Sequence, residues 1–272
     1  MTEVQQFFSS HPIFRFDEFR AAHSARAGRS PATTATVLKQ AVKAGRLVNL
    51  RRGLYTTVPP GGGATVADLD PFVLACRLAP DATLAYRSAL EFWGRSVSTS
   101  RQVFYYAARR ARPFRFGGRV FVPVLMRPPT RALADLASGI LTEDRQGLPV
   151  RVTSLERTLV DVLDVPRNGG TWPEIWRSLA SIPALDLDFV VLYAIRLGSA
   201  LTAARVGFFL EQHRDALGVD ERFLNALRRH APRHPLYVDG RRERGRLVPG
   251  WNLVVPEGWP CRVGVSGVSP KD

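Results

Sequence analysis

Apolar residues between positions 31 and 44 recur at the spacing of one helix face. The positions that form this stripe are Val37, Leu38, Ala41 and Val42. They predict a helix that buries this side. Ser30 is a suitable N-cap and Pro31 suits the first helical position, where its missing N–H costs nothing. Gly45 is placed to end the helix in a left-handed conformation.

The pattern then changes to alternation. Residues 46–50 and 54–58 each alternate apolar and polar side chains, and Arg51-Arg52-Gly53 separates them. Two short alternating runs around a glycine-containing turn predict a β-hairpin. A helix followed by such a hairpin is typical of a winged helix-turn-helix.

The chain before this helix supplies two further short helices. The patterns predict them over residues 2–9 and 18–23, with Asp17 as N-cap of the second and residues 24–29 as the turn to the third. Across residues 1–58 there are nine Lys or Arg and three acids. The predicted winged helix is therefore basic in its own right.

The polar side of the third helix carries hydrogen-bonding groups and cations without an acid among them. Such a face suits a DNA groove, and two arginines at the hairpin tip can reach phosphate or a narrow minor groove. The residues that we predict to bind DNA are Arg29, Ser30, Thr33, Thr36, Lys39, Gln40, Lys43, Arg51 and Arg52. The alternative is that this helix–hairpin unit is structural or binds a protein.

Composition agrees with a polyanionic partner. The 272 residues carry a formal net charge of +14, and all but three of the basic residues are arginine. Arginine suits bidentate contacts to phosphate or guanine. Genomic base composition is an alternative cause of the choice of arginine over lysine, but it does not explain the deficit of acids.

Cysteine content and hydropathy indicate the compartment. Cys76 and Cys261 are too few and too far apart for a disulfide framework or a cysteine-based zinc site. No apolar run approaches the roughly 18 residues of a membrane span, and the N-terminus lacks a signal-peptide pattern. We expect a cytoplasmic protein with no membrane partner.

The run Pro59-Pro60-Gly61-Gly62-Gly63 is the clearest boundary in the sequence. It predicts a winged helix over residues 1–59, a linker over 60–64, a larger domain over 65–262 and a flexible tail over 263–272. The fold class predicted is α+β, in which the larger domain combines a small antiparallel sheet with a helical bundle.

Periodicity within the larger domain predicts its elements. Helices are expected at 70–78, 82–93, 172–182, 187–197, 201–217 and 220–230. Strands are expected at 102–107, 114–116, 119–125, 150–152, 236–238 and 251–256. Gly117-Gly118 forms a hairpin turn, and Thr153-Ser154-Leu155-Glu156 is interpreted as a capping box before a further helix that ends near Pro166.

A long stretch of the larger domain lacks acids. No Asp or Glu occurs between Phe92 and Ala134, where nine arginines are found. Aromatic residues interleave with them, and such a surface could stack on the bases of single-stranded nucleic acid. The aromatic residues concerned are Tyr105, Tyr106, Phe114 and Phe116. The alternative, which the alternation favours, places the aromatics in the core of a sheet.

The sequence gives little support for a catalytic or metal-binding site. Asp161 and Asp164 are three apart and could share a face, but Glu156 is explained by the cap and Asp161 by an ion pair with Arg157. His230 and His234 are four apart, but the prolines around them disfavour a regular helix and no acid or cysteine cluster completes a shell. Phosphate-loop, metalloprotease, nucleophile-elbow and nucleotidyltransferase patterns are absent from the sequence. We therefore predict a non-enzymatic protein without metal or cofactor.

Several of these segments resemble a known family. The helix followed by G-R-L-V-x-L-R-R-G-L-Y, the stretch Tyr86–Leu90, the pattern V-x-V-T-S-L-E-R-T-L-V-D-V-L and the strand W-N-L-x-V-P are similar to those of AbiEi-type antitoxins. The resemblance implies the regulator of a type IV toxin–antitoxin system. Such a regulator represses its own operon by binding double-stranded DNA at inverted repeats in its promoter. It also antagonises a cognate nucleotidyltransferase-like toxin.

Two other classes of function stay open at this point. One is a nuclease that is targeted by the winged helix and uses acids such as Glu143, Asp144 and Asp161. The other is a one-component repressor whose aromatic domain binds a small effector. Metal-dependent DNA cleavage would favour the first, and release of DNA by an effector would favour the second.

Overall fold

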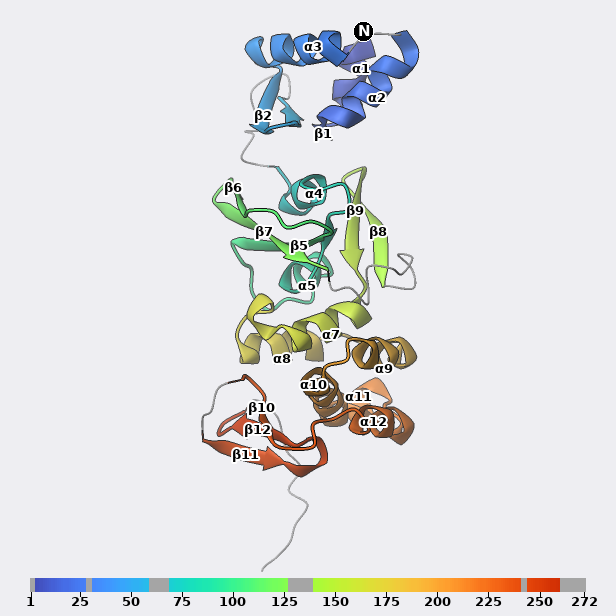
Figure 1. The fold of residues 1–272 in the computed structure, drawn as a ribbon, viewed down its shortest axis with the longest axis vertical. Helices are drawn as coiled ribbons and strands as arrows, with labels where there is room; N and C mark the ends of the chain where they lie inside the picture. The colour runs from blue at the N-terminus through green and yellow to red at the C-terminus, as the bar shows by residue number, and fades with distance from the viewer. Residues whose placement is uncertain (1–2, 28–30, 59–68, 127–138, 241–243, 260–272) are drawn as a thin grey trace, which may run out of the picture. The chain divides into compact units, whose positions relative to one another are not determined.

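The computed structural model describes residues 3–27, 31–58, 69–126, 139–240 and 244–259 (Figure 1). Within these ranges the fold class is the predicted one, α+β with an N-terminal winged helix-turn-helix. The predicted linker and tail, Arg127, Arg131 and Cys261 lie outside the described residues, so the predicted domain limits stay predictions.

The N-terminal part combines three helices with a three-stranded sheet. Its elements are α1 (Glu3–Ser10), β1 (Ile13–Arg15), α2 (Phe16–Ala27), α3 (Pro31–Lys43), β2 (Leu47–Arg51) and β3 (Leu54–Thr57). The strand order is β1-β3-β2, and both pairings are antiparallel. We call residues 3–58 the reader. The sequence patterns predicted its helices and the β2–β3 hairpin but not β1.

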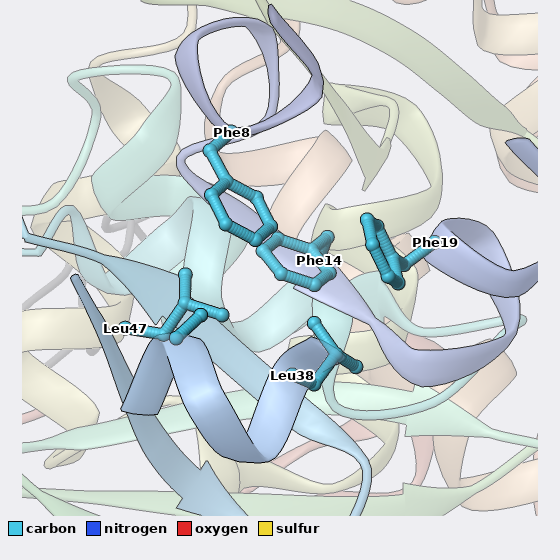
Figure 2. Packing of buried hydrophobic residues seen from close by; sticks show 6 residues of the cluster. Phe8, Phe14, Phe19, Leu38 and Leu47 are labelled. Atoms are coloured by element: carbon cyan, nitrogen blue, oxygen red, sulfur yellow. The ribbon is translucent and has the colours of Figure 1, made fainter. Parts of the chain in front are cut away.

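A cluster of apolar side chains holds the reader together. Figure 2 shows Phe8, Phe14, Phe19, Leu38 and Leu47 gathered between α1, α2, α3 and the sheet. Phe14 is fully buried, and its ring lies 5.7 Å from that of Phe8. Each buried aromatic or leucine side chain of this kind contributes roughly 1.5–3 kcal/mol. The cluster fixes α3 against the sheet and so determines which side of α3 faces outward.

The second helix begins two residues earlier than predicted. Asp17 is inside α2 rather than at its N-cap, and its carboxylate lies 3.3 Å from the Arg20 guanidinium. The Glu18 carboxylate takes the capping role, because its Oε2 accepts the Arg15 N–H at 2.6 Å. The prediction of Asp17 as the cap was therefore wrong, since β1 continues up to the helix and places Glu18 next to the free amide.

After the reader comes a six-stranded sheet in the order β6-β7-β5-β4-β9-β8. Its strands are β4 (Thr83–Leu84), β5 (Gln102–Ala107), β6 (Phe114–Phe116), β7 (Arg119–Leu125), β8 (Ile140–Arg145) and β9 (Leu148–Thr153). The β6–β7 hairpin across Gly117-Gly118 is confirmed. The sheet is larger than predicted, and β5 and β7 pair in parallel.

Two short helices accompany this sheet, α4 (Pro71–Arg77) and α5 (Arg87–Phe92). Asp70 caps α4, because its Oδ1 accepts from the amides of Phe72 and Val73 at 2.8 and 3.1 Å. The predicted helix over 82–93 is wrong in its first half. Thr83 and Leu84 form β4 instead, and Tyr86 has a φ of 55°, which interrupts the chain before α5.

The remaining chain is mainly helical. Its elements are α7 (Leu155–Asp164), η3 (Pro166–Asn168), α8 (Trp172–Ala180), α9 (Leu187–Arg196), α10 (Ala200–Gln212), α11 (Arg214–Leu217), α12 (Glu221–Arg228), β10 (Leu236–Tyr237), β11 (Gly245–Val248), η4 (Pro249–Trp251) and β12 (Leu253–Pro256). In the small C-terminal sheet β12 is central, parallel to β10 and antiparallel to β11. The structure therefore confirms the helices predicted over 172–182, 187–197 and 220–230, divides the one predicted over 201–217 into α10 and α11, and adds β11.

The cap of α7 differs from the predicted capping box. Ser154 is the N-cap, and its hydroxyl accepts the Arg157 N–H at 3.3 Å. Glu156 therefore lies one position too early to bond back to the cap, and its Oε1 accepts the Asp186 N–H at 3.3 Å instead. A complete capping box occurs at α8, where Glu174 Oε2 accepts from the Thr171 amide at 2.9 Å.

The chain divides into two compact units. The first contains Met1–Leu84, Arg101–Leu125 and Thr142–Arg151, and the second contains Ala85–Ser100, Met126–Leu141 and Val152–Asp272. The first unit thus includes the reader together with α4 and much of the sheet. The second unit contains α5 and the helices from α7 onward.

Candidate nucleic-acid interface

The C-terminal end of α3 has the geometry of a Schellman motif. The Gly45 N–H donates to Val42 O and the Arg46 N–H to Ala41 O, each at 3.0 Å. Gly45 has a φ of 70°, in the left-handed region that glycine occupies without a steric cost. The prediction that Gly45 ends this helix is confirmed. The chain then turns directly into β2, which places α3 beside the hairpin.

The inward side of α3 is formed by Thr34, Leu38 and Ala41, all buried. These positions follow the spacing i, i+4, i+7. The buried face of α3 is therefore rotated slightly about the helix axis from the predicted face. Val37 packs against the apolar cluster, but Val42 is 36% exposed, so the prediction that Val42 is buried was wrong. Thr34 is buried in its place, and hydropathy alone does not predict a buried threonine.

The outward side of α3 is the one that we predicted to meet DNA. Five of the predicted residues are exposed on it: Thr33, Thr36, Lys39, Gln40 and Lys43. Their face contains two cations and no acid, so its charge and hydrogen-bonding groups suit a DNA groove. Arg29 and Ser30, which complete the predicted set on this side, lie outside the described residues.

The hairpin has a two-residue turn. Arg51 pairs with Leu54, so Arg52 and Gly53 form the tip, and Gly53 O accepts the Phe16 N–H at 2.8 Å. Arg52 is exposed, whereas Arg51 is half-buried. The two arginines of the predicted wing therefore occupy different environments, although they are adjacent in the sequence.

A groove of about 860 Å³ lies between α3 and the hairpin. Its charged lining consists of four basic residues and one acid: Arg15, Lys39, Arg51, Arg52 and Asp17. The groove is therefore positive, and anionic phosphates would be attracted to it. Arg15 was not among the predicted residues. Only a prediction of β1 could have placed Arg15 beside the hairpin, and a strand of three residues is too short to be recognised from its alternation.

The half-buried Arg51 contacts other parts of the first compact unit. Its Nη2 donates to Leu78 O, and its guanidinium carbon lies 5.7 Å from the centroid of the Phe114 ring. Burial lowers the pKa of Arg51 from its usual value, and the nearby Arg15 charge lowers it further. Arg51 is thus held by protein groups in this structure.

The aromatic residues of the sheet are divided between interior and surface. Tyr105 and Tyr106 are buried, as expected if they are core positions, while Phe114 and Phe116 are half-buried. Burial raises the pKa of Tyr105. Four arginines around the aromatics are exposed: Arg109, Arg110, Arg112 and Arg115. The buried tyrosines cannot stack on bases, which leaves only the β6 side of the predicted surface.

The acids considered for catalysis are dispersed. Asp161 is buried, and its Oδ2 lies 3.2 Å from Arg157 Nε, which confirms the predicted ion pair. Its Oδ1 accepts the Tyr193 hydroxyl at 2.8 Å. Within the described ranges, no group of three or more His, Cys, Asp or Glu side chains could hold a metal ion. Among the same residues, no helix is both long and apolar enough to cross a bilayer.

Comparisons with known proteins bear on this interface. A model of the family described as "Transcriptional regulator, AbiEi antitoxin" matches residues 3–58, which are the reader. No curated protein matches the sequence.

Solved structures with a similar fold include the following one. It is the crystal structure of the RV2827C protein from Mycobacterium tuberculosis, which is 18% identical and superposes with a TM-score of 0.57 over 93% of this chain and 89% of that one. At this identity the likeness concerns the fold alone. The resemblance found from the sequence is confirmed in the segment that the family model covers. Residues 3–58 are therefore similar to the AbiEi antitoxin transcriptional regulators.

Proposed function

We propose that this protein is the DNA-binding regulator and antitoxin of a type IV toxin–antitoxin system. It would repress its own operon by binding inverted repeats in the promoter, and it would antagonise a nucleotidyltransferase-like toxin. The observation that carries the proposal is the acid-free outward face of α3, which borders a positive groove in a segment that matches the AbiEi regulator model. Promoter and toxin are inferred from that similarity.

The proposed contacts divide by chemistry. Lys39, Lys43 and Arg52 would neutralise phosphates, which fixes the reader on the duplex. Thr36 and Gln40 would reach base edges in the major groove, because short hydroxyl and amide groups discriminate donors from acceptors there. Thr33, at the start of the same face, would contact the backbone together with Arg29 and Ser30.

A selection experiment tests the division between these two classes. The full chain would be used to select duplexes from a random pool, and the selected sequence would be compared with the region upstream of its own gene. We expect an inverted repeat that also occurs there. Gln40→Ala and Thr36→Ala should each reduce the preference for it over random duplex by about 5- to 150-fold, as expected when roughly 1–3 kcal/mol of base discrimination is lost.

The control variant is Lys43→Ala, which should weaken binding to selected and random duplexes alike. If Gln40→Ala and Thr36→Ala also weaken both equally, α3 does not read bases. If the wild-type chain selects no sequence at all, the regulator proposal fails.

A further inference from the structure

We propose that Arg51 is a positioning residue that ties the hairpin to the C-terminal end of α4 and to β6, and that it does not contact DNA. Arg52 would then be the only arginine of the hairpin tip that binds phosphate. The part of the inference that concerns DNA rests on the proposed function. The part that concerns the tie between reader and sheet does not.

The end of α4 offers acceptors for a cation. The last carbonyls of a helix lack partners within it, and the helix dipole favours positive charge there. In α4 these are the carbonyls of Arg77 and Leu78. Arg51 Nη2 donates to Leu78 O, and Arg15 Nη1 lies 3.4 Å from Arg77 O and 3.5 Å from Leu78 O. Two guanidinium groups from the reader sheet therefore converge on one helix end.

The second contact of Arg51 is with β6. Its guanidinium lies over the Phe114 ring, and that ring packs in turn on Phe121, 5.9 Å away, which is fully buried in β7. A guanidinium over an aromatic face is attracted to the ring electrons, more strongly when it is desolvated. To reach a phosphate, Arg51 would have to give up both this ring and the Leu78 carbonyl.

Arg52 has the opposite environment. It lies in the turn after β2, its side chain is exposed, and it lines the groove beside α3 together with Lys39. Exposed cations beside α3 can bind phosphate more readily than a guanidinium that already donates to a carbonyl of the protein. The two adjacent arginines therefore suit different tasks.

Another contact joins the reader to α4 without Arg51. Arg77 Nη1 lies 2.7 Å from Glu18 Oε1, and Glu18 also accepts the Arg15 N–H. The reader should therefore stay folded and partly tethered when Arg51 is shortened. This permits a test of Arg51 in the whole protein.

The first measurement is hydrogen exchange of the full chain without DNA. Arg51→Ala should increase exchange by about tenfold at the hairpin tip and over residues 77–82, as expected when one charged hydrogen bond is removed. Arg52→Ala, the matched control, should leave exchange there unchanged. Arg51→Lys keeps the charge but removes the planar fork, so we expect an intermediate increase. If circular dichroism shows that Arg51→Ala is unfolded, Arg51→Lys replaces it in this measurement.

The second measurement is binding to a short duplex of random sequence at several salt concentrations. Arg52→Ala should reduce the slope of log affinity against log salt by about 0.9, the value for one phosphate that the protein no longer neutralises. Arg51→Ala should leave that slope unchanged.

Two outcomes overturn the inference: an equal reduction of the slope in Arg51→Ala, or exchange in Arg51→Ala that matches the wild type. If the wild-type chain does not bind the duplex, the proposed function fails, and the exchange measurement still decides whether Arg51 ties the reader to α4.

Discussion

In the reader, the basic side chains of α3 lie exposed on a face without acids, whereas in the second compact unit the arginines of α7 and α10 lie buried. Arg157 is fully buried and bonded to Asp161. Arg205 donates from Nε to Val238 O at 2.7 Å and from Nη1 to Leu163 O at 2.9 Å. Its burial lowers its pKa to about 10.

This difference shows how far net charge can be used to infer a partner. A formal charge of +14 includes arginines that serve as internal donors, and these contribute nothing to a surface that DNA could touch. Only the exposed cations on one face bear on binding. Arg51 and Arg52 show the same difference in two consecutive residues, because Arg51 donates within the protein and Arg52 is exposed.

The largest effect is expected at the buried pair. Arg157→Ala leaves the Asp161 carboxylate buried without its cation, which should lower the free energy of unfolding by about 3–5 kcal/mol. The same variant should leave the salt dependence of DNA binding unchanged while the protein is folded. Urea unfolding followed by tryptophan fluorescence measures the first quantity. A decrease below about 1 kcal/mol would mean that Arg157 resembles an exposed arginine, and the comparison would break down.

A smaller effect is expected from Glu174 in the second unit. Its hydrogen bonds from Ser98 and Thr171 hold its pKa at about 2, below the usual 4.5. Because the folded pKa is lowered, Glu174 stabilises the fold above about pH 4.5, and this contribution is lost as the pH falls toward 2.

Glu174→Gln removes the titrating group. The variant should therefore differ most from the wild type near neutral pH, and the difference should shrink on acidification. Thermal unfolding at several pH values measures this. A difference that is constant with pH would show that the ionised carboxylate is not the group that these hydrogen bonds stabilise.

The sequence predicted the parts of the fold that have local signals. Helix α3 and the β2–β3 hairpin carry their own stripe, end signal and turn, so both are found where expected. Strand β1 was missed because three residues become a strand only by pairing with β3, about forty residues later. The parallel pairing of β5 with β7 is non-local in the same way. The predicted helix over 82–93 failed where Tyr86 adopts a positive φ, which periodicity does not reveal.

In the candidate site, too, the features with local sequence signals were predictable and those that depend on remote residues were not. Exposure of Lys39, Gln40 and Lys43 follows from the helix period alone, so it was predictable. The environment of Arg51 was not, because it depends on where α4 ends and on the Phe114 ring, both remote in sequence. Whether these residues bind DNA stays a prediction.

The most direct test of the account is a salt titration of DNA affinity in two sets of variants. One set removes exposed cations of the reader, by Lys39→Ala, Lys43→Ala and Arg52→Ala. The control, Arg196→Ala, removes an exposed arginine of α9 in the second unit. We predict that each reader variant flattens the slope of log affinity against log salt by about 0.9, and that the control leaves it unchanged. Equal slopes in all four variants and the wild type would contradict the assignment of the reader as the DNA-binding surface.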